Sequence, residues 1–204
     1  GLEFSGEIVE SGSEVEDLAA GDHVFGITAG EAQAEYLTID ASLLAAKPET
    51  LSFAEAAAVP EAFVTAHDAI VTQADLQAGE ILLIHAVVIG TSRSADKLAR
   101  CDEFGLDLGI EFTDDTDMPT VIAERFQGRG ADVILDLVGA PYFEQNLKSL
   151  ALKGRLMLVG LTGGRAANFD LSTALYKRAT IKGTVLRPRP IEEKAAAMRG
   201  FEGD

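Results

Sequence analysis

The 204-residue sequence contains a single cysteine, Cys101, and no tryptophan. One cysteine excludes a disulfide within the chain and a cysteine-based zinc cluster, and it favours a reducing compartment. No apolar run approaches the roughly 18 residues of a membrane-spanning helix, since the longest candidate, residues 81–89, is about half that length. The chain also shows no signal-peptide pattern at its start. We therefore expect a cytoplasmic protein that does not interact with membranes.

Basic residues are scarce as well. The chain has 17 Lys and Arg against 33 Asp and Glu, which gives a formal net charge of −16. An acidic surface of this kind repels nucleic-acid backbones, so no nucleic-acid partner is expected, although a local basic pocket can still bind one nucleotide. The 47% of hydrophobic residues is enough for the core of one large or two small domains.

The first 50 residues have the pattern of short strands separated by glycine-containing turns, which predicts part of a β-rich unit. Strands are expected at residues 4–9, 23–27 and 34–39. Ser52 and Glu55 then have the spacing of a capping box, which predicts that a helix begins there, and a second helix is expected over residues 62–73.

From residue 81 onward, apolar runs alternate with amphipathic segments. Strands are expected at residues 81–84, 87–89, 108–112, 133–138, 156–159 and 180–185. Helices are expected between them, at residues 95–104, 118–126, 142–150 and 171–177. Apolar strands that alternate with helices indicate an α/β fold with a doubly wound, Rossmann-type parallel sheet covered on both faces. Such sheets bind ligands in the crevice beyond the carboxyl ends of their strands.

One junction in this alternation is too short. The runs at residues 81–86 and 87–90 are fused, whereas parallel neighbours need a crossover of about a dozen residues or more. In a dinucleotide-binding domain the crossover holds the glycine-rich turn and the helix that bind the pyrophosphate, and no G-x-G-x-x-G occurs in this chain. Two alternatives remain open: the segment is deleted, or it belongs to the protein and is missing from this sequence. The chain also begins and ends within expected elements, so we interpret it as an internal fragment.

Several motifs resemble the medium-chain dehydrogenase/reductase superfamily. They include GLEFSGEIV at residues 1–9 and GDHVFG at residues 21–26. Those typical of its NADPH:quinone oxidoreductase, or zeta-crystallin-like, branch lie at residues 60–66, 84–86, 128–133, 136–139, 154–156 and 186–190. The resemblance implies a homodimer and three parts: a partial GroES-like substrate domain (1–58), a Rossmann domain (59–186) and the start of a return segment (187–204). It also implies that on the order of 20 residues are absent between Ala86 and Val87.

The residues after the second Rossmann strand favour NADPH over NADH. An acid at this position is typical of NAD binding, whereas here Arg93, Ser94 and Lys97 follow residues 91–92. The resemblance points to Ser94 and Lys97 as contacts of the 2′-phosphate, and Arg93 is added because its guanidinium suits a phosphate. The alternative is a solvated loop in which Ser94 only caps the next helix, and Asp96 counts slightly against the phosphate.

The resemblance also implies which residues frame the rest of the cofactor. The nicotinamide end is expected near Thr65, on the helix that joins the domains, and near the strand-end residues Val138, Gly139, Gly160, Leu161 and Thr162. Phe112 stands where relatives often have a tyrosine near the adenosine. The alternatives are that Thr65 bonds back to a helix carbonyl and that the glycines at 163–164 form only a flexible turn.

Metal binding is not expected. Zinc-dependent relatives have Gly-His-Glu where this chain has Gly1, Leu2 and Glu3, and its three histidines share no ligand spacing. Hydride transfer to a quinone depends chiefly on an oriented cofactor, so a zinc-independent NADPH:quinone oxidoreductase is expected. Catalytic residues remain unknown, because relatives place them in the absent N-terminal part. The alternatives are reduction of an activated C=C bond in an enone or enoyl substrate and a non-catalytic, crystallin-like binding protein.

Overall fold

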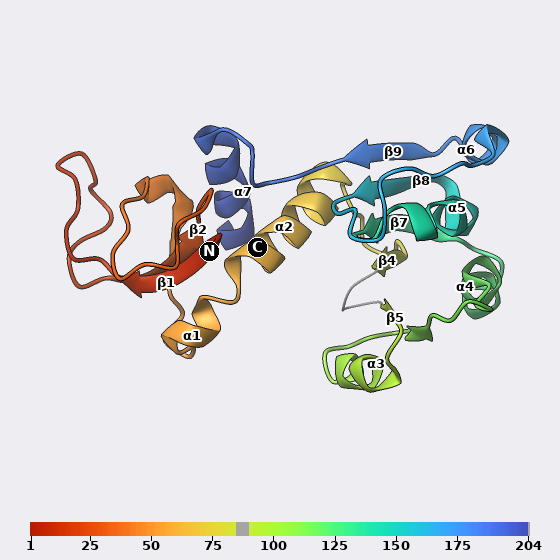
Figure 1. The fold of residues 1–204 in the computed structure, drawn as a ribbon, viewed down its shortest axis with the longest axis horizontal. Helices are drawn as coiled ribbons and strands as arrows, with labels where there is room; N and C mark the ends of the chain where they lie inside the picture. The colour runs from red at the N-terminus through yellow and green to blue at the C-terminus, as the bar shows by residue number, and fades with distance from the viewer. Residues whose placement is uncertain (85–89, 204) are drawn as a thin grey trace. The chain divides into compact units, whose positions relative to one another are not determined.

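A computed structural model of the chain describes residues 1–84 and 90–203 (Figure 1). The chain divides into two compact units, one formed by Gly1–Thr72 with the stretch from Val185 onward, the other by Gln73–Thr184. These divisions differ from the boundaries expected after residues 58 and 186, and the domain names given above stay predictions. None of the helices in the described part of the chain is both long and apolar enough to span a membrane.

The first unit contains a three-stranded antiparallel sheet with β2 in the centre. Its strands are β1 (Glu3–Glu7), β2 (His23–Ile27) and β3 (Leu44–Ala46), with the short 3₁₀ turn η1 (Ala41–Leu43) before β3. Its helices are α1 (Phe53–Ala56), α2 (Pro60–His67), which continues into the π-helical η2 (Asp68–Gln73), and α7 (Ile191–Gly203). The core combines sheet and helix residues, and Leu186, Ala197 and Met198 bring the end of the chain into it.

The strand expected at residues 34–39 is wrong, because this segment forms no strand. Polar and apolar residues alternate in the segment as in a strand. However, β2 already pairs with β1 on one edge and with β3 on the other. Asp40 accounts for this difference, because its side chain accepts a hydrogen bond from the backbone N–H of Ser42 at 2.9 Å and so starts the turn that leads into β3. The capping box of Ser52 and Glu55 is confirmed at the start of α1. Pro60 opens α2 at its first turn, where its missing N–H costs nothing.

The second unit is built from parallel strands joined by helices. The strands are β4 (Leu82–Ile84), β5 (Thr91–Ser92), β6 (Ile110–Glu111), β7 (Ala131–Asp136), β8 (Leu150–Leu158) and β9 (Thr180–Gly183). The helices are α3 (Ala95–Asp102), α4 (Met118–Arg125), α5 (Ala140–Ser149) and α6 (Leu171–Lys177). Three consecutive residues of β7, at 133–135, are buried, as a strand covered on both faces requires.

The strand order confirms the doubly wound α/β fold. Four strands run in the order β4-β7-β8-β9, and β5 pairs with β6. A parallel bridge between Ile84 and Gly90 places β5 beside β4, so the full order is β6-β5-β4-β7-β8-β9. The order changes direction between β4 and β7, which makes this the point where such folds bind ligands. The strand expected at 87–89 and the missing crossover between Ala86 and Val87 lie outside the described residues and stay predictions.

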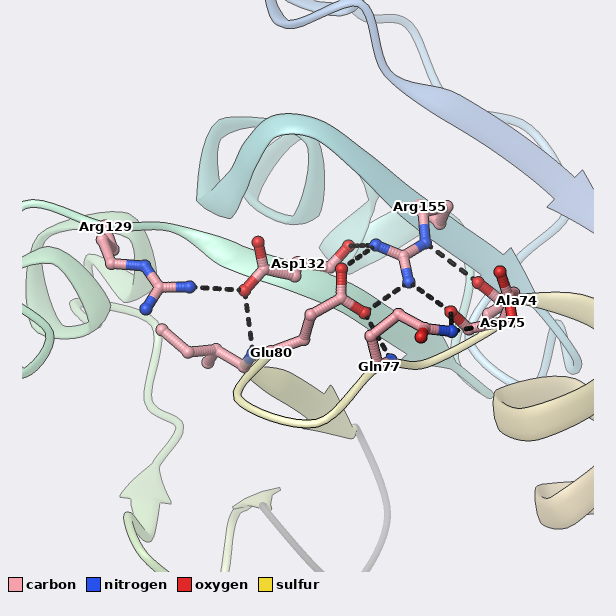
Figure 2. A network of polar contacts seen from close by, with 8 residues as sticks. Ala74, Asp75, Gln77, Glu80, Arg129, Asp132 and Arg155 are labelled. Carbon is pink, nitrogen blue, oxygen red and sulfur yellow. Dashed lines mark hydrogen bonds and ion pairs between the residues drawn. The ribbon is translucent and has the colours of Figure 1, made fainter.

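A network of charged groups holds the amino-terminal side of this sheet together (Figure 2). Arg155 of β8 forms a two-pronged ion pair with Glu80, with both nitrogen–oxygen distances 2.6 Å. It also donates to the carbonyls of Ala74, Asp75 and Asp132. These bonds tie the segment that enters β4 to β7 and β8, which lie far from it in the sequence.

Candidate functional site

The carboxyl ends of the parallel strands meet at one edge of the second unit. The loops after β7 and β8 reach this edge beside the point where the strand order reverses, and β5 and β6 end on the other side of that point. Most of the predicted cofactor residues of this unit lie in the loops that follow these strand ends: Arg93, Ser94, Phe112, Val138, Gly139, Gly160, Leu161 and Thr162. Lys97 lies in the first turn of α3, the helix that follows β5. Thr65 lies on α2, in the other unit.

The loops after β7 and β8 are bonded to each other along their length. The carbonyl of Asp136 accepts from the N–H groups of Val159 and Gly160, at 2.8 and 3.2 Å. Further along, the N–H of Gly163 donates to the carbonyl of Val138 at 2.8 Å, and a parallel bridge joins Gly139 to Gly164. These backbone bonds join the two loops into one surface, which we call the floor, and they give residues 163–164 partners in the loop after β7.

Glycine is required where the two loops come closest. Gly139 has a φ of +87°, and a Cβ atom there would lie 2.6 Å from the carbonyl oxygen of Gly164. A Cβ at Gly160 would lie 2.7 Å from the carbonyl oxygen of Leu137. Side chains at these positions would push the loops apart, so both glycines permit the close contact between the two loops.

Replacing Gly139 with alanine is expected to lower the free energy of unfolding by about 2–3 kcal/mol, because it adds a clash to an unfavourable φ. Gly105 offers a matched control, since its φ is +85° but a Cβ there would meet nothing within 4 Å. Gly105→Ala is therefore expected to cost only about 1 kcal/mol. Urea denaturation of both variants measures the difference, and equal losses would show that the contact with Gly164 does not matter.

The side chain of Asp136 supports the same floor and was not singled out from the sequence. Its carboxylate is fully buried, and Oδ1 accepts from the N–H groups of Val138 and Gly139 at 2.8 and 2.9 Å. Oδ2 accepts from Nδ2 of Asn146 at 3.1 Å. The signal in the sequence was an acid inside the otherwise apolar run at residues 133–138, because a buried carboxylate must be satisfied by several donors.

The tip of β5 carries the candidate contacts for a 2′-phosphate. Ser94 caps α3, since its Oγ accepts from the N–H of Lys97 at 3.4 Å, as the alternative interpretation expected. The side chains of Arg93 and Lys97 are exposed near the start of this helix. Residues 91–95, between the start of β5 and Asp96, include no acid. The cap and a phosphate contact are compatible, because a helix N-terminus and two cations all favour an anion.

Thr65 and Phe112 differ in how their side chains are engaged. The Oγ1 atom of Thr65 is buried and makes no hydrogen bond within the described part of the chain, so the alternative of a bond back to a helix carbonyl is wrong. The half-buried ring of Phe112 packs edge-on against Tyr142, with 4.3 Å between centroids.

The described residues include no group of three His, Cys, Asp or Glu side chains that could hold a metal ion, and the absence of zinc stays a prediction from the sequence. The carboxylate of Glu3 accepts from the backbone N–H of Glu61 at 2.8 Å and so caps the start of α2. Burial, and secondarily the charge of Glu3, raises the pKa of the Glu61 carboxyl.

Known proteins resemble the chain over most of its length. Residues 81–201 match the family described as zinc-binding dehydrogenase. A "Quinone oxidoreductase-like protein 2 homolog" of Nematostella vectensis is 32% identical over 203 aligned positions, which take in 90% of this chain and 55% of that protein. The chain thus spans about half the length of the curated relatives it matches. Ninety per cent of 204 residues is about 184, so the 203 positions include on the order of 20 for which this chain has no residue.

Two solved structures share the fold. An NAD-dependent alcohol dehydrogenase is 27% identical to this chain, with a TM-score of 0.80. The superposition includes 100% of this chain and 72% of that dehydrogenase. The JamJ enoyl reductase, in its apo form, is 26% identical to this chain, with a TM-score of 0.79. The superposition includes 99% of this chain and 65% of that reductase. These similarities extend over both units of the chain.

Proposed function

Because the chain belongs to the zinc-binding dehydrogenase family of the medium-chain dehydrogenase/reductase superfamily, we propose that it is part of an NADPH-dependent quinone oxidoreductase. The observation that carries this proposal is the bonded floor after β7 and β8, at the point where the strand order reverses. A relative named as a quinone oxidoreductase-like protein supports the choice of a quinone as hydride acceptor.

The residues at this edge suit a nicotinamide dinucleotide. The glycines at 139 and 160 let the loops after β7 and β8 pack closely against each other. In the other unit, the buried hydroxyl of Thr65 lacks a partner in the described residues. Arg93, Lys97 and the start of α3 suit a phosphate on the ribose. When bound, NADPH supplies the hydride, and the chain's own residues hold the cofactor and exclude water. No step of the proposal uses a metal, and independence of zinc stays a prediction from the sequence.

Turnover of the full chain with different acceptors tests the proposal. NADPH oxidation is followed by absorbance with a simple quinone, with an enone and with an enoyl thioester. Faster turnover with the quinone supports the proposed function. Preference for the enone or the enoyl thioester would instead favour reduction of an activated C=C bond, the alternative that the similarity to an enoyl reductase supports.

A non-catalytic binding protein is the second candidate. It is favoured because this chain has no residue at some positions of the alignment with the Nematostella vectensis protein. If these belong to the predicted crossover, the pyrophosphate loses its usual loop and helix. NADPH binding without turnover on any acceptor would support this candidate. Loss of both binding and turnover would support a true deletion. The intact mass should be measured first, because a value near 21.5 kDa excludes an additional segment.

Lys97→Glu tests the choice of cofactor. We expect the variant to weaken NADPH binding roughly 100-fold and NADH binding less than about 3-fold, because only NADPH carries the 2′-phosphate. Arg100→Glu is the matched control, since Arg100 lies on the same helix but in its last turn. Fluorescence titration of each variant with NADPH and with NADH measures the dissociation constants. Equal weakening of NADPH and NADH would contradict the 2′-phosphate assignment.

The homodimer also remains part of the proposal. Strand β9 is the edge strand of its sheet, and all four of its residues are exposed. An open edge of this kind leaves backbone groups available for another strand, and a second copy would satisfy them.

A further inference from the structure

We propose that a cleft at the amino-terminal edge of the second unit's sheet binds a small phosphate-bearing anion through Lys177, Lys148 and Ser149. The cleft has a volume of about 410 Å³, which is enough for a phosphorylated small molecule. It lies between α4, the end of α5, the start of β8 and Lys177 of α6. This edge is opposite the carboxyl ends that carry the loops after β7 and β8.

The charge of the cleft is the reverse of the charge of the chain. Three cations, Arg129, Lys148 and Lys177, line it, and no acidic residue does, although acids outnumber bases almost two to one in the sequence. Arg129 pairs with Asp132 at 3.0 Å and Lys148 with Glu144 at 2.7 Å, so these two charges are partly balanced. The excess of positive charge therefore rests on Lys177.

Lys177 is a half-buried cation that has no ion-pair partner within residues 1–84 and 90–203. Its Nζ donates to the backbone carbonyls of Lys148, at 2.6 Å, and Leu150, which leaves one of its three N–H groups for another acceptor. None of the ion pairs among the described residues includes it. Burial lowers the pKa of the Lys177 ammonium, which reflects this lack of a partner. An anion in the cleft would supply the missing charge.

Ser149 provides a second, independent observation. It lines the cleft, only 2% of its surface is exposed, and its Oγ has no hydrogen-bond partner in the described residues. Buried hydroxyls are nearly always paired, so the unpaired Oγ of a residue that lines the cleft points to an acceptor outside the described residues. Phosphate oxygens accept from both ammonium and hydroxyl groups, and lysine recognises phosphate as a point charge. The small residues Pro119 and Ala123 of α4 leave the space open.

Calorimetric titration of the full chain with inorganic phosphate tests the site, with sodium chloride added to hold ionic strength constant. Glucose 6-phosphate and citrate serve as further probes, to separate free phosphate, a phosphomonoester and a carboxylate. We expect saturable binding of phosphate or the phosphomonoester. Lys177→Met is expected to weaken it by roughly 10-fold or more. Absence of saturable binding by either probe, or stronger binding of citrate, would overturn the proposal.

Two lysines serve as controls. Lys47 also donates to two backbone carbonyls, those of Pro48 and Leu51, but lines no part of the cleft, so Lys47→Met is expected to leave phosphate binding unchanged. Lys97→Gln, at the tip of β5, separates this site from the proposed cofactor site. If binding is lost with Lys97→Gln and kept with Lys177→Met, the phosphate binds at the cofactor site and the cleft proposal is wrong.

Ser149→Ala keeps the test valid if Lys177→Met does not fold. The hydroxyl of Ser149 has no partner to lose in the described residues, so this variant is expected to keep its stability. It should still bind phosphate several-fold more weakly than the unchanged chain. Amide NMR signals of Gly128 and Gly130 should shift on titration, because both residues line the cleft. Full affinity in Ser149→Ala together with unmoved signals would contradict the site.

Discussion

Replacing Arg155 with methionine is expected to lower the free energy of unfolding by about 3 kcal/mol. All five N–H groups of the guanidinium donate hydrogen bonds, two to Glu80 and one each to the carbonyls of Ala74, Asp75 and Asp132. Methionine fills similar space but leaves Glu80 as a partly buried carboxylate without its counter-charge. Because the side chains of Arg155 and Glu80 are 20% and 22% exposed, water compensates part of the loss.

Arg129→Gln is the matched control within the same network (Figure 2). Arg129 also pairs with an acid, Asp132, at 3.0 Å, but its side chain is 57% exposed. Its removal is expected to cost less than about 1 kcal/mol, as for other surface ion pairs. Urea denaturation followed by circular dichroism measures both variants. Similar losses would show that the burial and the additional bonds of Arg155 contribute nothing.

The same pair predicts how stability depends on acid. Hydrogen bonds from Arg155 lower the pKa of Glu80 from 4.5 to about 2. A carboxyl with a lowered pKa stabilises the folded state above its unfolded value, so this contribution is complete above pH 4.5 and is lost as the pH falls towards 2. After allowance for solvent screening it amounts to about 1–2 kcal/mol. In Arg155→Met this part of the acid sensitivity should disappear, and an unchanged pH profile would contradict the assignment.

Local patterns predicted the elements whose signals are local. The apolar runs of β4 and β7, the capping box at Ser52 and the helix Leu171–Lys177 could all be identified from neighbouring residues. The pairing of Glu80 with Arg155 could not, because 75 positions separate them and no local pattern links the two residues. The division into units also depends on long-range packing, since Leu186 and Met198 join a core whose other residues lie far away in the sequence.

The candidate site shows the same limit. Its glycines and the cations after β5 could be identified from the sequence, because their residue types suit a cofactor and a family resemblance points to most of them. The bonds between the loops after β7 and β8 depend on the register in which β7 pairs with β8. A continuous apolar run does not determine that register. The cleft beside Lys177 combines residues from α4, α5, β8 and α6, and only the fold brings them together.

Removing the carboxylate of Asp136 is expected to have the largest effect on the site. Asp136→Ala removes the shared acceptor of three buried or half-buried donors, those of Val138, Gly139 and Asn146. At about 1–3 kcal/mol for each donor that loses this acceptor, part of it recovered by relaxation, the expected loss of unfolding free energy is about 4 kcal/mol. The floor after β7 would then lose the bonds that hold Gly139, so NADPH binding should weaken as well.

Asp136→Asn separates positioning from simple stability. Its amide oxygen can still accept from the N–H groups of Val138 and Gly139, but its amide nitrogen then faces Nδ2 of Asn146, and two donors oppose each other. We expect a loss of about 2 kcal/mol and NADPH affinity weakened roughly 10-fold in the folded protein. A purely structural role would lower stability without changing the dissociation constant, which fluorescence titration of the folded variant measures.

Exchanging the two side chains completes the test. Asn146→Asp alone places two carboxylates about 3.1 Å apart in a buried site, and their repulsion should unfold much of the protein at neutral pH. In the double variant Asp136→Asn with Asn146→Asp, the amide at 136 can donate to the carboxylate at 146, while its oxygen still accepts from the loop. We therefore expect the double variant to be more stable than Asn146→Asp and to recover most of the NADPH affinity lost in Asp136→Asn. Additive losses would mean that these side chains do not act as a pair, and the floor would then owe its shape to the backbone bonds and glycines alone.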